Sequence, residues 1–471
     1  MKQEPVSRGT GIPGRQLQPG EDANIVLTEE SAEVLRTTVG MVSGHADAIT
    51  AAFYRRLLAA HPPLRQVFNQ GSQATGEQAR ALAAAVVGFA GHLLRTPGPA
   101  QPGQPGQAFN GVLRRIAHRH ASLGVRPDQY PVVGQHLLAA IGEVLGEAVT
   151  PRVHRAWDEM FWLFATALIA EEARIYQRGG SNPANPWRSW RVTARTVTTP
   201  EVLSLDLVPA GIDPLPDYLP GQYVSVAVDL PDVGRQARQY SLSRAPGAGS
   251  LRITVRRVPA TGDAPAGAVS SHLHNRVAVG DLLDLSAPTG HVTLAPGADP
   301  LVLISAGIGT APMIAMLGHT ARLRPGRTVV VAHADRSPAH HPLRTEMLDL
   351  AALLRDVRLH TWYEADTPPA KGAPADDPGP GAGATRAAGP AAASGSGSDR
   401  PAPGRAVACE IRHRGRIDVD ALPLPDGARV YLCGPPPFMR DVRAGLLRRG
   451  VPEARIRYEV FGSDPWAGAP T

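Results

Sequence analysis

The sequence has 471 residues, enough for about three domains of roughly 150 residues each, so it is too long for a single small binding module. Hydrophobic residues make up 43% and charged residues 19%, a globular balance, while 49 glycines and 46 prolines predict some unstructured length. The net charge is +6, but lysine occurs only at Lys2 and Lys371, and the arginines are scattered without interleaved aromatic residues. General arginine enrichment therefore explains the charge better than a nucleic-acid surface does.

Two cysteines, Cys409 and Cys433, are too few for a disulfide framework, and no apolar N-terminal stretch resembles a secretory signal. We therefore expect a cytoplasmic protein, a monomer with no stable membrane anchor and no nucleic-acid partner. The longest apolar run, residues 301–318, has membrane length but contains a Gly-Ile-Gly turn signal. It predicts a buried strand, a loop and the start of a helix.

Residues 1–23 show no hydrophobic period and predict a disordered leader. The first helix is expected near Thr28, which precedes the acidic pair Glu29 and Glu30. Apolar residues then recur three and four apart up to about residue 178, interrupted by a Pro/Gly loop at 96–107. The pattern predicts an all-α domain over residues 24–180.

After a polar linker at 181–186 the hydrophobic period changes to two. Short strands are predicted at 192–207, 223–228, 251–256 and 282–285, which indicates an antiparallel β-barrel domain over 187–297. Strands at 301–305, 328–332, 358–362 and 430–433 then alternate with helices from about 312 and at 345–354. This alternation predicts a parallel α/β domain over 298–471, with a disordered insertion at 367–405 after which the fold resumes at Ile417.

One histidine and one carboxylate stand out in the helical domain. His120 extends an apolar stripe with Leu113 and Ile116, whereas His118 is rotated by about 200° and faces elsewhere. His120 is either a core histidine or a metal ligand on this evidence. Glu172 shares a helical face with Phe161, so its carboxylate needs a hydrogen-bond partner, which an imidazole N–H or water at the helix end can supply.

Several segments of this domain resemble the globin domain of flavohaemoglobins: 53–54 (Phe-Tyr), 68–69 (Phe-Asn), 78–82 (Gln-Ala-Arg-Ala-Leu), 120–122 (His-Ala-Ser) and 129–131 (Gln-Tyr-Pro). The resemblance implies that His120 is the proximal ligand of haem b and that Arg119, where the family usually has lysine, keeps a cation near the haem. It further implies a haem contact by Phe68, a distal lining of Tyr54, Gln78 and Leu82, and a proximal pair, Tyr130 and Glu172, that polarises the histidine.

In the barrel, the segment 238–241 (Arg-Gln-Tyr-Ser) resembles the flavin motif of the ferredoxin-reductase superfamily, and two flanking segments match the same superfamily in order. Alternation along a strand places a cation and an aromatic ring on one face and a hydroxyl on the other. An edge strand with a solvated arginine is the structural alternative. The resemblance implies FAD contacts from Tyr223, Arg238, Gln239, Tyr240, Ser241, Val269, Ser270, Val460, Phe461, Gly462 and Ser463.

The glycine-rich turn at 307–312 follows a predicted strand and opens a helix, so its backbone N–H groups can hold a dinucleotide phosphate. Together with residues 433–435 (Cys-Gly-Pro) it resembles the nicotinamide side of the same superfamily, although Cys433 can equally be a buried small hydrophobe. The implied NAD(P) contacts are Gly307, Ile308, Gly309, Thr310, Ala311, Pro312, Cys433 and Gly434, with Glu459 as an acid that tunes the redox behaviour.

The resemblance covers nearly the whole ordered chain and implies an oxidoreductase. NAD(P)H is expected to reduce FAD, FAD to reduce haem b, and the haem to convert nitric oxide and O2 to nitrate. Two alternatives stay open: a haem-based oxygen store or gas sensor with an auxiliary reductase, and a flavin reductase that serves a separate acceptor.

Overall fold

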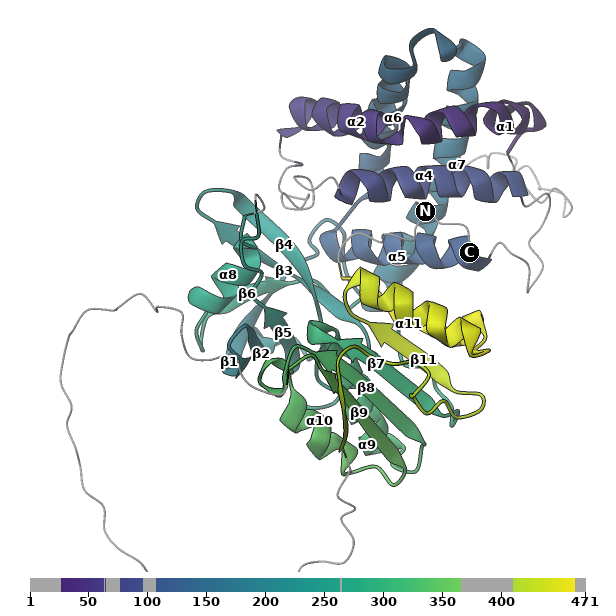
Figure 1. Cartoon of the computed structure of the whole chain (residues 1–471). Helices are drawn as coiled ribbons and strands as arrows, with labels where there is room; N and C mark the ends of the chain where they lie inside the picture. The colour runs from purple at the N-terminus through teal and green to yellow at the C-terminus, as the bar shows by residue number, and fades with distance from the viewer. Residues whose placement is uncertain are drawn as a thin grey trace, which may run out of the picture.

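The structure is a computed structural model that describes residues 27–62, 64, 77–95, 107–262, 265–365 and 410–461 (Figure 1). The expected leader, the Pro/Gly loop up to residue 106 and the insertion lie outside these residues, as do Phe68, Gly462 and Ser463. The described chain forms a helical domain, an antiparallel barrel and a parallel α/β domain in this order, which confirms the predicted fold class.

The helical domain contains α1 (Glu29–Gly44), α2 (Ala46–Ala60), α4 (Glu77–Arg95), α5 (Gln107–Leu123), α6 (Tyr130–Leu145) and α7 (Pro151–Gly179). Thr28 caps α1, since its side chain accepts a hydrogen bond from the Ser31 N–H. Apolar faces of these helices enclose one core, in which Leu35, Leu57 and Trp157 are fully buried. The core fixes the positions of α5, α6 and α7, which supply the histidine, the phenol and the carboxylate singled out above.

The barrel consists of β1 (Arg188–Thr199), β2 (Val202–Pro209), β3 (Tyr223–Leu230), β4 (Gly234–Ser241), β5 (Leu251–Arg256) and β6 (Leu282–Leu285), with α8 (Ala268–Asn275) against it. Its strands are ordered β4-β3-β6-β1-β2-β5, and all pairs are antiparallel. The sheet closes where Leu242, just after β4, bridges Ile253 in β5. The barrel thereby encloses its own apolar core, which includes Leu203, Val226 and Leu285.

The single strand predicted at 192–207 is wrong. Residues 200 and 201 form a turn, and Thr199 pairs directly with Val202, so the segment is a hairpin of β1 and β2. Pro200 explains the break because it has no backbone N–H to continue the ladder.

The third domain contains β7 (Leu301–Ala306), α9 (Thr310–Leu323), β8 (Val329–Asp335), α10 (Arg344–Ala351), β9 (Val357–Tyr363), β10 (Glu410–Arg414), β11 (Arg429–Cys433), α11 (Pro436–Arg448) and β12 (Ile456–Glu459). The strands form a parallel sheet in the order β10-β9-β8-β7-β11-β12. Helices α9 and α10 cover one face and α11 covers the other. The apolar run 301–318 becomes β7, a Gly-Ile-Gly turn and most of α9, as predicted.

The expected return of the fold at Ile417 is wrong as well, because the sheet already resumes at Glu410 with β10. This strand has the sequence Glu-Ile-Arg-His-Arg and lies at the edge of the sheet, where charged residues are favoured over apolar ones. Its composition therefore gave no strand signal.

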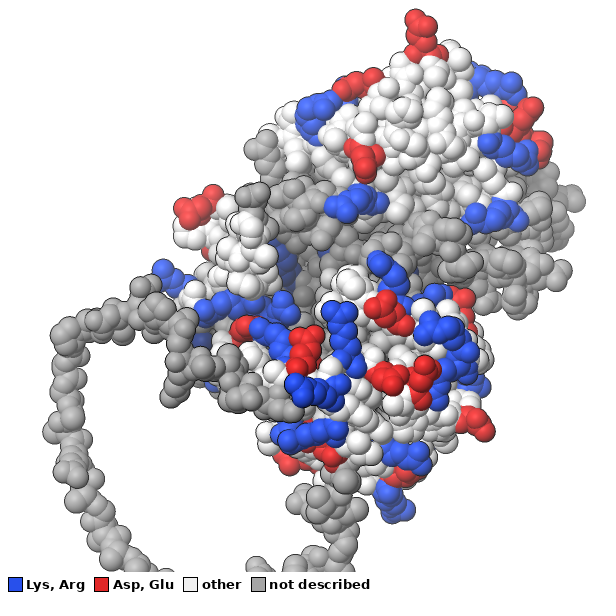
Figure 2. Space-filling model, in the orientation of Figure 1, with Lys and Arg blue, Asp and Glu red and all other residues white. Residues whose placement is uncertain are grey.

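Charge is mixed on the surface, with basic and acidic side chains intermingled over the parallel α/β domain in Figure 2. Among the residues that the structure describes, no helix is both long and apolar enough to cross a bilayer.

Candidate active site

His120 lies in a hydrogen-bonded cluster of three side chains from three helices. Its Nδ1 is 2.8 Å from Glu172 Oε1 and 3.0 Å from the Tyr130 hydroxyl, and Tyr130 donates to the same Glu172 oxygen at 2.6 Å. Because the phenol gives its single proton to the carboxylate, the imidazole must carry a proton on Nδ1 to donate as well. The Nε2 lone pair of His120 is therefore left for another partner.

The cluster is buried on its carboxylate side. Glu172 is 1% exposed because it lies on the inward face of α7, which also carries Leu168. Two donors offset the cost of burying this group. Burial, reinforced by the Glu172 charge, raises the pKa of Tyr130, so the phenol stays protonated and remains a donor. His120 is more open, with 32% of its side chain exposed.

Three residues predicted on the opposite side of the haem come from α2 and α4. Tyr54 follows the buried Phe53, and the two rings meet edge to face at 4.9 Å. Burial raises the pKa of Tyr54, against the opposing charge of Arg119. Leu82 packs on the core one turn after Gln78, whose buried Oε1 has no hydrogen-bond partner among the described residues. A buried amide oxygen in this state is suited to a bound molecule.

The predicted flavin residues gather on β3 and β4. The register of these two strands pairs Tyr223 with Ser241 and Val226 with Arg238. Tyr223 therefore lies beside the flavin motif on the neighbouring strand. The Ser241 hydroxyl is buried and has no partner within the described chain. Arg238 donates to the Ala237 carbonyl at 2.7 Å, and its burial lowers its pKa.

Two further flavin predictions concern α8. The Val269 side chain is 1% exposed and belongs to the barrel core. The Ser270 hydroxyl donates to the Gly267 carbonyl and accepts from the Val258 N–H. Both side chains already have partners within the fold. The groups of this segment that can still bind a phosphate are mainly the backbone N–H groups at the start of α8.

The predicted nicotinamide residues flank the point where the strand order of the parallel sheet reverses. Gly307 has a φ of +53°, and a Cβ on Gly309 would lie 2.3 Å from the Cys433 carbonyl oxygen. The turn after β7 is therefore in close contact with the turn after β11. Crevices at such reversal points are the usual ligand sites of open α/β sheets.

Cys433 and Glu459 lie side by side on β11 and β12. Cys433 is fully buried, and burial raises the pKa of its thiol, with a smaller contribution from Glu459. Val460 is buried next to this pair, whereas Phe461 is 41% exposed.

Helix α5 also contacts the two other domains, which motif reasoning did not anticipate. The Arg119 cation lies close to Tyr223 of the barrel and Glu459 of β12, and Arg115 lies 5.0 Å above the Tyr458 ring. Ser122 and Ser225 are hydrogen-bonded at 2.9 Å. The rotation of His118 away from the His120 face was the available signal that a second face of α5 has a partner.

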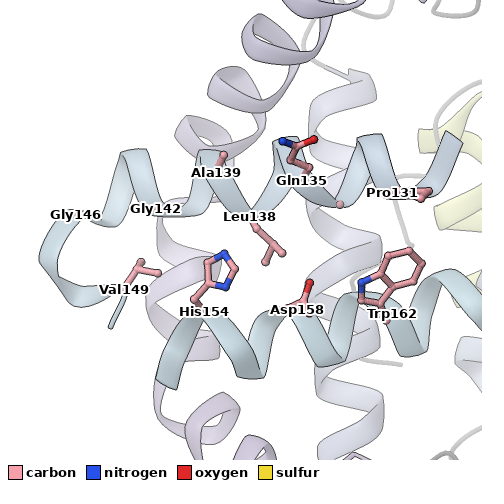
Figure 3. Close-up of a pocket in the computed structure, with 11 residues that line it drawn as sticks. Pro131, Gln135, Leu138, Ala139, Gly142, Gly146, Val149, His154, Asp158 and Trp162 are labelled. Atoms are coloured by element: carbon pink, nitrogen blue, oxygen red, sulfur yellow. The ribbon is translucent and has the colours of Figure 1, made fainter. Parts of the chain in front are cut away.

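A groove of about 630 Å³ lies between α6 and α7 (Figure 3). Leu138 and Trp162 line it together with His154 and Asp158. Among the predicted site residues that the structure describes, none lines this groove, so it is separate from the His120 cluster.

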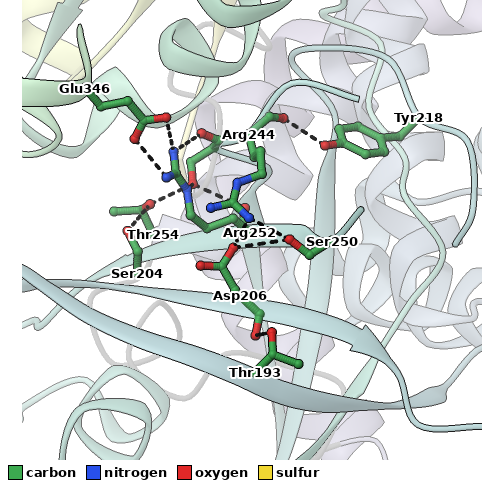
Figure 4. Close-up of polar contacts among 10 residues, drawn as sticks. Thr193, Ser204, Asp206, Tyr218, Arg244, Ser250, Arg252, Thr254 and Glu346 are labelled. Atoms are coloured by element: carbon green, nitrogen blue, oxygen red, sulfur yellow. Dashed lines mark hydrogen bonds and ion pairs between the residues drawn. The ribbon is translucent and has the colours of Figure 1, made fainter. Parts of the chain in front are cut away.

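The barrel and the parallel domain are joined by a partly buried ion pair (Figure 4). Arg252 of β5 contacts both carboxylate oxygens of Glu346 in α10, at 2.8 and 2.9 Å. Arg252 also donates to the Ser243 hydroxyl. This bidentate contact holds the barrel and the parallel domain in one arrangement.

Three family models match consecutive parts of the chain: a globin at residues 51–168, an oxidoreductase FAD-binding domain at 196–294 and an oxidoreductase NAD-binding domain at 303–375. A flavohemoprotein of Bordetella parapertussis is 41% identical over 447 residues, covering 93% of this chain and 99% of the relative. The chain belongs to the flavohemoprotein family.

A flavohemoprotein of Rhizobium meliloti is 37% identical and covers 94% of this chain and all of the relative. Among solved structures, the flavohemoglobin of Malassezia yamatoensis with bound FAD and heme has a TM-score of 0.75 at 30% identity, and covers 93% of this chain and 100% of its own. Family membership makes the chain an oxidoreductase. It also confirms the expected cofactor classes of haem, FAD and a nicotinamide dinucleotide.

Proposed function

We propose that this flavohemoprotein is an NAD(P)H-dependent nitric oxide dioxygenase. The observation that carries the proposal is the His120–Glu172–Tyr130 cluster, because a carboxylate on Nδ1 raises the electron donation of the imidazole and favours oxygen activation over reversible storage. When bound, haem supplies the iron at which nitric oxide and O2 form nitrate, and FAD converts a hydride into single electrons.

The residues of the helical domain fit a haem. The Nε2 lone pair and the partial exposure of His120 suit a ligand that would hold the haem iron, and Gln78 Oε1 lacks a partner in the described chain. In this proposal Tyr54 would donate a hydrogen bond to the bound O2, and Gln78 and Leu82 would line the same side of the haem pocket. Arg119 places a positive charge between the haem side and Glu459.

The residues of the reductase fit a flavin and a dinucleotide. The Ser241 hydroxyl has no partner within the described part of the chain. It would orient the flavin together with side chains on the same two strands: Tyr223, Arg238, Gln239 and Tyr240. The backbone of the turn after β7, next to Cys433 and Gly434, would hold the nicotinamide dinucleotide. Glu459 would tune the flavin electrostatically, and Val460 and Phe461 would lie against it.

The test is oxidation of NADH and NADPH by the haem- and FAD-loaded protein in aerated buffer, before and after a small addition of nitric oxide. A fast burst of oxidation, stoichiometric with nitric oxide loss, is expected. Slow oxidation of NADH and NADPH whose rate does not change on addition of nitric oxide contradicts the proposal and favours an oxygen store or sensor. Fast reduction of added electron acceptors by protein without haem favours a reductase for a separate acceptor. Light scattering of the same preparation checks the predicted monomer.

A further inference from the structure

Two different faces of helix α5 make contacts outside the helix. His120 is directed at the Glu172 cluster, whereas a second face contacts the barrel and β12. The second face consists of residues three, four and seven positions apart, a spacing that places them on one side of a helix: Arg115, His118, Arg119 and Ser122. We refer to these four residues as the docking face.

Ser122 is linked to the barrel by a series of three hydrogen bonds, of which the central one is buried. Gln239 Nε2 donates to Ser225 Oγ at 3.2 Å, Ser225 Oγ donates to Ser122 Oγ at 2.9 Å, and Ser122 Oγ donates to the Arg119 carbonyl at 2.7 Å. Each serine has a single hydroxyl proton, so the direction of these hydrogen bonds is fixed. Ser122 also interacts with the Tyr223 side chain of the barrel.

Both serines in this series of hydrogen bonds are buried. Ser225 is 0% and Ser122 is 1% exposed, so water cannot replace a lost partner without a rearrangement of the interface. The backbone around Ser225 is itself fixed, because its N–H donates to the Ser286 hydroxyl and its carbonyl accepts from the Ser286 N–H. Ser225 therefore holds a defined position in β3.

A second link lies on the next turn of the docking face. His118 Nδ1 accepts a hydrogen bond from the Gly290 N–H at 3.0 Å and lies 2.6 Å from Thr289 Oγ1. Since a backbone N–H can only donate, Nδ1 is unprotonated and the Thr289 hydroxyl donates to it as well. Two points of contact on one rigid helix fix both its position and its rotation.

We propose that Ser225 is a positioning residue for electron transfer from the flavin to the haem. Its hydroxyl connects Gln239 of the flavin motif to Ser122, two residues after His120, and thereby sets the position of the ligand helix relative to the flavin. This role rests on the proposed function, because it requires electrons to pass from the barrel to the helical domain. Domains within one chain move relative to each other unless such contacts hold them.

The test separates two rates in the holoenzyme. The protein is mixed anaerobically with excess NADH under carbon monoxide, and flavin bleaching and the shift of the haem Soret band are followed by stopped flow. Ser225→Ala is expected to slow haem reduction about fivefold, the effect of one buried hydrogen bond, while flavin reduction keeps its rate. Ser122→Ala should do the same from the haem side. The double variant should be slowed by less than the product of the two single effects, because both changes remove the bond between Ser122 and Ser225.

Ser204→Ala is the matched control. Ser204 is 2% exposed and its hydroxyl pairs with Thr254 at 2.9 Å, a buried hydroxyl pair inside the barrel, and the variant should leave both rates unchanged (Figure 4). Unchanged haem reduction in Ser225→Ala, additive losses in the double variant, or an equal slowing of flavin reduction each overturn the positioning role. Failure of the wild-type flavin to reduce the haem overturns the proposed function, and the positioning role with it.

Discussion

Glu172 lies 2.8 Å from His120 although 52 residues separate them in the chain. The carboxylate comes from the inward face of α7 and the imidazole from α5, so the contact exists only because the helical core packs these two helices together. An acceptor-only partner on Nδ1 sets the tautomer of His120 and increases its basicity at Nε2.

Glu172→Gln tests the electronic effect of this contact. The amide keeps the shape and one acceptor but removes the charge, so the imidazole should donate less strongly to iron. We expect normal haem content, a lower iron–histidine stretching frequency by resonance Raman spectroscopy, and a nitric oxide dioxygenase rate about 10- to 100-fold lower. Tyr130→Phe, which leaves the carboxylate in place, should have a smaller effect on both readouts. An unchanged stretching frequency in Glu172→Gln would contradict the polarising role.

His120→Ala is expected to abolish haem retention, because the imidazole Nε2 is the proposed axial ligand. The ratio of Soret to protein absorbance after haem loading measures this directly. His118→Ala is the control two residues away: His118 faces Thr289 and Gly290 of the barrel, so this variant should keep its Soret band. A full Soret band in His120→Ala would refute the ligand assignment.

The ion pair between Arg252 and Glu346 should contribute to the stability of the reductase. Arg252 is 7% exposed, and Arg252→Ala leaves the Glu346 carboxylate without its bidentate partner. We expect a loss of about 2 kcal/mol in the free energy of unfolding, below the value for a fully buried pair because Glu346 is partly exposed.

The matched control for this pair is Arg336 with Glu201, which joins the same two domains at 2.7 Å on the surface. Arg336→Ala should cost less than about 1 kcal/mol because solvent screens this pair. Urea unfolding followed by flavin fluorescence and circular dichroism compares the two. Equal losses in both variants would show that burial does not distinguish them.

The sequence predicts correctly those features of the fold and site that depend on residues close together in the chain. The helix start near Thr28, the strand–turn–helix at 301–318 and the inward placement of Glu172 each follow from a few neighbouring residues. Strand β10 was missed because its charged residues lie at a sheet edge. The link between Ser122 and Ser225 joins residues 103 positions apart, and no local pattern distinguishes such a serine from others in a barrel strand.

The close contact between the two turns of the nicotinamide side gives a last prediction. A Cβ on Gly309 would lie 2.3 Å from the Cys433 carbonyl and 2.9 Å from the Gly434 nitrogen, both backbone atoms that cannot rotate away. Gly309→Ala should therefore displace the phosphate-binding turn and lower kcat/KM for NAD(P)H about 10- to 100-fold, while haem and FAD content stay normal.

Gly326→Ala serves as the control in the same domain, because no atom of the described residues lies within 4 Å of a Cβ at this position. It should leave flavin reduction by NADH and NADPH unchanged. Reduction with sodium dithionite, which bypasses the dinucleotide, should be normal in both variants. If Gly309→Ala slows reduction by dithionite as much as reduction by NADH, its effect is a general loss of flavin geometry, and the assignment of this turn to the dinucleotide fails.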